Sequence, residues 1–92
     1  MKPDMTLPQL QAYVQEKLIA RGLVSPLPDE VLHLMEEVGE VVRAMRRGDK
    51  ANLGEELADC LFFILSAANV ADIDLQAALT EKEKRNCIRF GA

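Results

Sequence analysis

Apolar and polar residues follow each other along this chain with the 3.6-residue period of an α-helix. No segment keeps the two-residue period of a strand, and β-branched residues are scattered through the helical patterns. Turn-forming residues divide the chain into four segments, whose predicted helices end near Arg21, Arg47, Ala71 and Arg89. The pattern therefore predicts an all-α fold, a four-helix antiparallel bundle with short connections, in a single domain over residues 1–92.

Short polar residues and glycines mark the ends of these helices. The expected N-caps are Thr6, Asn52 and Asp74. Thr6 and Asn52 should form capping boxes, with Gln9 and Glu55 respectively. Pro26 and Pro28 form a rigid lead-in to the second helix. Gly22 and Gly48 stand where the first two helices should end, because glycine adopts the left-handed conformation of a helix C-terminus without strain. The turn after Gly48 is short, so the second and third helices are expected to form an antiparallel hairpin.

The second predicted helix has one apolar and one polar side. The apolar side consists of Val31, Leu34, Met35, Val38, Val41, Val42 and Met45. The polar side consists of His33, Glu36, Glu37, Glu40, Arg43 and Arg47. Glu36 and Glu37 each lie one turn from Glu40, so three carboxylates crowd one patch. Considered by itself, such a patch fits a solvated helix face.

The third predicted helix is apolar nearly all round, which predicts burial on most of its sides. Glu56 and Asp59 interrupt it and share one face, three residues apart. Burying a carboxylate without a partner is expensive and shifts its pKa instead. Asp59 is therefore not expected to be a free surface acid, and another group should face it.

Two kinds of partner remain open for these acids. One is a set of basic residues on the second helix, namely Arg43, Arg46 and Arg47. The other is a metal ion held between the two helices by Glu37, Glu40, Glu56 and Asp59. Oxygen ligands without paired Cys or His favour a hard cation, Mg²⁺ or Mn²⁺. A ferritin-like di-iron site is excluded, because the single histidine, His33, precedes the glutamates.

Composition and charge narrow the classes of function. The chain carries 11 Lys and Arg against 15 Asp and Glu, a formal net charge of −4. This balance argues against nucleic acid as the main ligand, but not against a small phosphorylated ligand whose charge metal ions offset. Two cysteines, Cys60 and Cys87, are too few to staple the fold, and no apolar run is long enough for a signal sequence or membrane span. We expect a soluble, cytoplasmic protein.

Two acidic segments and a C-terminal segment together resemble a known family. Glu36-Glu37-Val38-Gly39-Glu40 and Glu56-Leu57-Ala58-Asp59, separated by residues 41–55, resemble the two motifs of the MazG-like nucleoside triphosphate pyrophosphohydrolases. Lys82, Asn86 and Arg89-Phe90 resemble the family's C-terminal Lys/Asn/Arg segment, and all three lie on one helix face. The resemblance covers about residues 28 to 90. Each motif is weak alone, but the three in this order on a helical chain are specific.

The resemblance implies an enzyme that hydrolyses a nucleoside triphosphate to its monophosphate and pyrophosphate with Mg²⁺, as in nucleotide-pool cleansing. It implies a homodimer, or a dimer of dimers, that completes a MazG-type all-α fold. The implied metal ligands are Glu37, Glu40, Glu56 and Asp59, with Glu36 as a further ligand or as the base that orients water. The implied phosphate-binding residues are Lys82, Asn86 and Arg89. Phe63, one turn from Asp59, is the best-placed aromatic residue to stack on a nucleobase, and core packing explains it equally well.

Two other functions stay open. The related phosphoribosyl-ATP pyrophosphohydrolases have the same carboxylate pattern, usually with a Lys shortly before the paired glutamates and a Tyr-His pair after the Asp. His33 and Phe62-Phe63 stand at those places here, so the fit is poorer. A non-enzymatic acidic helical module that oligomerises or binds a partner would also explain the aliphatic content and the acidic faces. It does not explain why acids interrupt the most apolar helix opposite a second acidic cluster.

Overall fold

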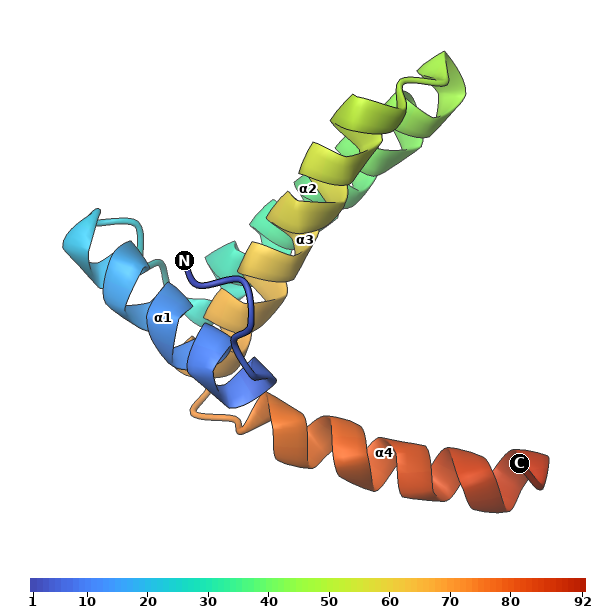
Figure 1. Ribbon diagram of the computed structural model, residues 1–92. Helices are drawn as coiled ribbons and strands as arrows, with labels where there is room; N and C mark the ends of the chain where they lie inside the picture. Colours follow the sequence, from blue (N-terminus) through green and yellow to red (C-terminus); the bar gives the residue numbers. More distant parts are fainter.

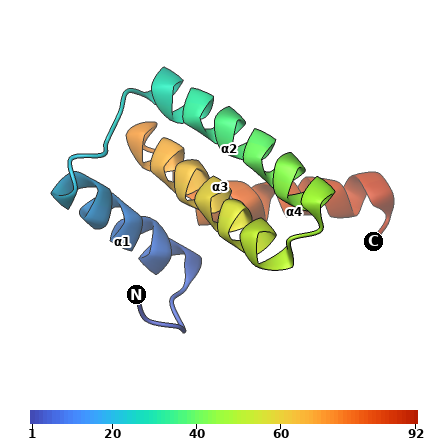
Figure 2. The ribbon, with the colours of Figure 1, turned by 90° about the horizontal axis from the view of Figure 1, so that it is seen from above.

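The computed structural model describes residues 1–92 and contains four α-helices and no strand, which confirms the predicted all-α fold (Figure 1). The helices are α1 (Leu7–Ala20), α2 (Leu27–Arg47), α3 (Lys50–Val70) and α4 (Leu75–Phe90). Viewed from above, α3 lies between α1 and α2 (Figure 2). None of the four helices has the length and apolar character that crossing a bilayer requires.

The helix ends follow the local chemistry with one exception. The capping box at α1 is confirmed, because Thr6 Oγ1 accepts from the Gln9 amide at 3.3 Å and Gln9 Oε1 accepts from the Thr6 amide at 2.8 Å. Gly48 ends α2 in the left-handed conformation, with φ +68°. The prediction that Asn52 caps α3 is wrong. The cap is Asp49, whose carboxylate accepts from the Asn52 amide at 3.1 Å, so the turn after α2 is even shorter than expected.

The core of one chain is thin. Six of 92 residues are buried, namely Val14, Glu30, Ala44, Leu65, Ser66 and Ala68. The aliphatic stripe on α2 is largely exposed, at Val31, Met35, Val38, Val42 and Met45. The prediction that the third helix is buried on most sides is also wrong, because α1 and α2 leave the outer side of α3 uncovered at Leu57, Leu61 and Ile64. A single chain therefore leaves apolar surface that a protein of this size would normally bury.

Helix α4 packs mainly beside α1 and diverges from the α2–α3 pair (Figure 1). Its cap is Asp74, as predicted, whose carboxylate accepts from the Ala77 amide at 3.1 Å. No residue of α4 is buried. The radius of gyration is 14.9 Å, against about 12 Å for a compact chain of this length. Because α4 extends away from the other helices, most of its surface is open to solvent.

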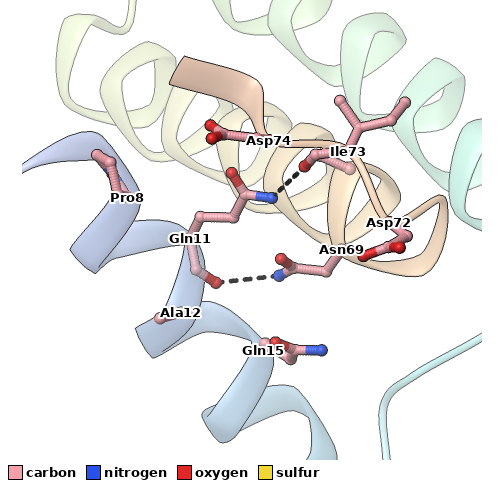
Figure 3. Close-up of a pocket in the computed structure, with 9 residues that line it drawn as sticks. Pro8, Gln11, Ala12, Gln15, Asn69, Asp72, Ile73 and Asp74 are labelled. Atoms are coloured by element: carbon pink, nitrogen blue, oxygen red, sulfur yellow. Dashed lines mark hydrogen bonds between the residues drawn. The ribbon is translucent and has the colours of Figure 1, made fainter. Parts of the chain in front are cut away.

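The corner between α3 and α4 is tied to α1 by hydrogen bonds (Figure 3). Gln11 Nε2 donates to the Ile73 carbonyl at 2.7 Å, and Gln11 Oε1 accepts from the Leu75 amide at 3.2 Å. Asn69 Nδ2 donates to the Gln11 carbonyl at 3.0 Å. Asp72 turns the corner with φ +56°, a left-handed conformation that Asp tolerates better than most residues. These bonds join α1 to the corner from which α4 leaves the other three helices.

Candidate metal centre

Three carboxylates from two helices converge. Glu37 of α2 and Glu56 and Asp59 of α3 each offer an oxygen, and these oxygens lie within 4.8 Å of one another. The helical spacing places Glu56 and Asp59 on one face, and the short turn at Gly48 and Asp49 holds α2 antiparallel beside it. Hydrophobic packing along the hairpin thus brings together side chains that repel one another.

The exposure of Asp59 differs from the sequence-based prediction. Glu37 and Glu56 are half-buried, but Asp59 is exposed. The prediction that Asp59 is not a surface acid is wrong for a single chain, because Asp59 borders an open cavity lined by α1, α2 and α3 and no helix covers it there. The groups that face Asp59 are the carboxylates of Glu37 and Glu56, so neither of the two kinds of partner considered for it, a basic residue or a metal ion, is present in the chain itself.

No basic side chain neutralises the three acids. The chain has three salt bridges, and none of them includes Glu37, Glu56 or Asp59. Burial raises the pKa of Glu37, and a hydrogen bond with Glu56 and the negative charges around it raise this pKa further. Burial and the same acids raise the pKa of the Cys60 thiol, which lies beside them on α3. The cluster therefore holds an excess of negative charge that a cation would relieve.

Glu40 and Glu36 flank the cluster and do not join it. The Glu40 carboxylate pairs with Arg43 at 3.0 Å, close enough to the cluster for its charge to contribute to the raised pKa of Glu37. The side chain of Glu36 is 75% exposed, with a carboxylate oxygen 3.7 Å from His33 Nδ1. The structure thus brings together three of the five predicted carboxylates, with the other two on the adjoining surface of α2.

An aromatic pair and a cavity adjoin the acids. The rings of His33 and Phe63 stack with centroids 5.5 Å apart and planes at 27°. A cavity of about 500 Å³ lies against this pair and shares Asp59 with the cluster. Glu30, which sequence reasoning missed, also lines it. Its position two helical turns before Glu37, on the same face of α2, could have indicated that Glu30 lies near the acids.

The C-terminal residues lie apart from the acids in a single chain. Lys82 and Arg89 are exposed, Asn86 is half-buried, and the Arg89 guanidinium lies 5.1 Å from the centre of the Phe90 ring. These residues are on α4, which packs mainly beside α1 and diverges from the hairpin (Figure 1). One chain therefore does not bring its C-terminal cations to its own acidic cluster.

Comparison with known proteins shows the family. Residues 29–88 match the MazG nucleotide pyrophosphohydrolase domain. The chain is 42% identical to the phosphoribosyl-ATP pyrophosphatase of Methanosphaerula palustris over 80% of this chain and 72% of that protein. It is 38% identical to the protein of the same name from Rhizobium etli over 75% of this chain, and 31% identical to the histidine biosynthesis bifunctional protein HisIE of Deinococcus radiodurans over 94%. The chain spans 61% and 44% of the length of these two relatives. It belongs to the MazG nucleotide pyrophosphohydrolase family.

Proposed function

We propose that the chain hydrolyses the bond between the α and β phosphates of a nucleoside triphosphate in a Mg²⁺-dependent reaction, and that phosphoribosyl-ATP is its substrate. The observation that carries the reaction type is the convergence of Glu37, Glu56 and Asp59 within 4.8 Å without a basic partner. The choice of substrate is supported by relatives at 42% and 38% identity that are phosphoribosyl-ATP pyrophosphatases. This choice replaces general nucleotide-pool cleansing, which the sequence favoured, as the leading hypothesis.

The donor set fits a hard divalent cation. Glu37, Glu56 and Asp59 offer only carboxylate oxygens, which Mg²⁺ and Mn²⁺ prefer. Their mutual repulsion, expressed in the raised pKa of Glu37, is what a bound cation would offset. Such an ion, when bound, offsets the charge of the phosphates and lowers the pKa of water. Glu40 would join the ligands by giving up Arg43, and Glu36 would orient the attacking water.

The phosphate-binding residues would come from a second copy of the chain, which makes the active protein a homodimer or a dimer of dimers. Lys82, Asn86 and Arg89 would hold phosphate oxygens and stabilise charge on the departing pyrophosphate. In support, Leu79, Ile88 and Phe90 expose apolar surface on the same helix. The solvent-accessible surface of the chain is 6805 Å², against about 5,300 Å² for a compact monomer of this mass. The surplus of about 1,500 Å² per chain exceeds the area of about 800 Å² that each partner buries in a standard interface.

One observation favours a second substrate class. His33 and Phe62-Phe63 stand where the phosphoribosyl-ATP pyrophosphohydrolases usually have a Lys and a Tyr-His pair. A substrate without the second phosphoribosyl group, such as an ordinary or damaged nucleoside triphosphate, is therefore the alternative.

An assay of pyrophosphate release separates these possibilities. The protein is incubated with phosphoribosyl-ATP, and in parallel with a panel of standard and modified nucleoside triphosphates, with Mg²⁺ and with a chelator. We expect the fastest release from phosphoribosyl-ATP, only with Mg²⁺. Faster release from another nucleotide would identify the cleansing function instead. No release from any nucleotide, together with no thermal stabilisation by Mg²⁺, would leave the non-enzymatic module.

A further inference from the structure

The cavity beside the acidic cluster has the size and position of a nucleoside pocket. Its volume of about 500 Å³ lies within the range of about 300–1,000 Å³ typical of small-molecule sites. The end of α1, the loop before α2, the first turns of α2 and the middle of α3 line it. Because the cavity shares Asp59 with the cluster, a ligand with its phosphates at the acids has its other end here.

Glu30 is the unusual residue of this cavity. It is 1% exposed, and Glu30 Oε1 accepts one hydrogen bond, from the Ser25 amide at 3.0 Å. None of the three salt bridges involves Glu30, although Arg21 lines the same cavity. Glu30 Oε2 accepts no hydrogen bond within the chain, and it is not fully enclosed, because every fully buried side-chain polar atom has a partner. Glu30 lines the cavity, and this second oxygen is the atom of its carboxylate that has no partner within the chain.

A buried carboxylate needs such a donor. Removing an ionised group from water is costly unless hydrogen bonds compensate for it, and one backbone amide leaves half of this carboxylate unsatisfied. The loop before α2 needs only the one oxygen that accepts from Ser25. The other oxygen has no task within the chain, and a ligand N–H group would complete its hydrogen bonding.

The aromatic wall indicates the shape of that ligand. The stacked rings of His33 and Phe63 both line the cavity, so one wall of it is aromatic. Flat heterocycles stack on aromatic side chains with little preference among bases, so discrimination must come from hydrogen bonds at the ring edge. Adenine has an amino group as a donor at position 6, whereas hypoxanthine has an oxygen acceptor there. Hypoxanthine also has a donor at N1, where adenine has an acceptor, so a carboxylate separates the two only where it faces position 6, where it attracts the amino group and repels the oxygen.

We propose that Glu30 is a specificity-determining residue that accepts a hydrogen bond from the 6-amino group of a purine bound in this cavity. The orientation of the ligand, with its phosphates toward the acidic cluster, rests on the proposed function. The selectivity itself does not, because it depends only on the cavity, the aromatic wall and the free carboxylate oxygen. The cavity therefore takes an adenine nucleotide in preference to a 6-oxopurine nucleotide.

The Glu30→Gln variant tests this directly. Its side-chain carbonyl can still accept from the Ser25 amide, while its NH₂ group replaces the free oxygen, so the cavity presents a donor in place of an acceptor. Dissociation constants for AMP and IMP, which differ in the group at position 6 of the purine and in the proton at N1, are measured by calorimetry with Mg²⁺ present. We expect the unmodified protein to bind AMP about tenfold to a hundredfold more tightly than IMP. The variant should lose this preference and favour IMP.

Matched controls separate selectivity from general effects. Glu16→Gln makes the same chemical change at an exposed position of α1 and should leave the AMP-to-IMP ratio unchanged. Phe63→Leu should weaken binding of both nucleotides by a similar factor, because stacking does not discriminate between them. Circular dichroism shows whether each variant keeps its helices.

The outcomes keep the two proposals apart. Equal affinities of the unmodified protein for AMP and IMP would overturn the role of Glu30, and this test holds even if Glu30→Gln does not fold. An unchanged ratio in a folded Glu30→Gln variant would overturn it as well, while pyrophosphate release could still support the proposed function. The expected reversal without pyrophosphate release from any nucleotide would support the pocket and refute the proposed function.

Discussion

The α2–α3 hairpin and α4 each carry polar residues that family resemblance assigns to one site. A single chain brings together only the residues of the hairpin. In the hairpin, Glu37, Glu56 and Asp59 come within 4.8 Å because a short turn and extensive packing hold the two helices side by side. In α4, Lys82 and Arg89 are exposed on a helix that leaves the other three (Figure 1). Like charges are thus brought together, while the cations that would balance a phosphate stand apart.

This difference separates local from non-local determinants of the site. The hairpin depends on residues close in sequence, whose register one turn fixes. The place of α4 in the active protein depends on what covers its exposed side, and nothing within the chain does so. The acidic half of the site should therefore respond to single substitutions within one chain, and the cationic half should respond also to association between chains.

The largest effect is expected from loss of a cluster carboxylate. Asp59→Asn and Glu37→Gln keep side-chain size and remove one charge each, so metal binding should weaken. Substitution of residues that merely support metal ligands costs about tenfold to a hundredfold, and loss of a ligand should exceed this in the rate of pyrophosphate release. Glu55→Gln, an exposed neighbour on α3, is the control and should stay active. Full activity of Asp59→Asn would remove Asp59 from the metal site.

A subunit-mixing experiment tests whether the acids and the cations of one site come from one chain or from two. Asp59→Asn and Arg89→Ala should each be nearly inactive. If α4 of one copy serves the acids of the other, mixed dimers contain one intact site, and random pairing should restore about a quarter of the normal activity. If both halves of the site belong to one chain, mixing restores none. Pyrophosphate release after co-refolding an equimolar mixture measures the outcome.

A smaller effect is expected from the apolar side of α4. Ile88 is 86% exposed in one chain, and Ile88→Glu should move the protein toward monomer and lower its melting temperature, increasingly so on dilution. Lys84→Glu places the same residue at an exposed polar position of α4 and should change the assembly less. Analytical ultracentrifugation over a concentration series gives the answer. A protein that is monomeric at all concentrations before any substitution would contradict the self-association proposal.

The comparison also explains which features could be predicted from the sequence. Helix ends at Thr6, Gly48 and Asp74 follow from local capping chemistry, and so does the hairpin that joins the acids. The misplaced cap at Asn52 is also local, because Asp49 competes for the same role three residues earlier. The exposure of Asp59 could not be predicted, since it depends on which sides of α3 other helices cover.

The burial of Glu30 is a second feature that could not be predicted from the sequence. A glutamate in the first turns of a helix is ordinarily a solvated residue at the positive end of the helix dipole. Its burial depends on the path of the loop from α1, whose Ser25 amide it binds at 3.0 Å. Periodicity within α2 places Glu30 on the same face as Glu37, but it contains no information about the loop that covers it.

The pH dependence of stability should reveal the charge repulsion within the acidic cluster. The pKa of Glu37 is raised in the folded chain, so without metal its contribution to stability is present at acidic pH and is lost as the pH rises through the raised value. Mg²⁺ needs the deprotonated form, so its stabilising effect should grow over the same pH interval. Melting curves with and without Mg²⁺ should therefore diverge toward neutral pH. In Glu37→Gln both trends should flatten, and unchanged trends would assign the effect to another group.

The smallest effect is expected at the corner from which α4 leaves the other three helices. Gln11 donates to Ile73 and accepts from Leu75, so Gln11→Ala removes both bonds, whereas Gln11→Glu keeps only the acceptor. Each lost bond should cost about 0.5–1.5 kcal/mol of stability. If these bonds also hold the direction of α4, amide hydrogen exchange should rise around Leu75 and pyrophosphate release should fall a few-fold, more in Gln11→Ala than in Gln11→Glu. Equal loss of stability without any change in activity would mean that the second copy, and not this corner, fixes the position of α4.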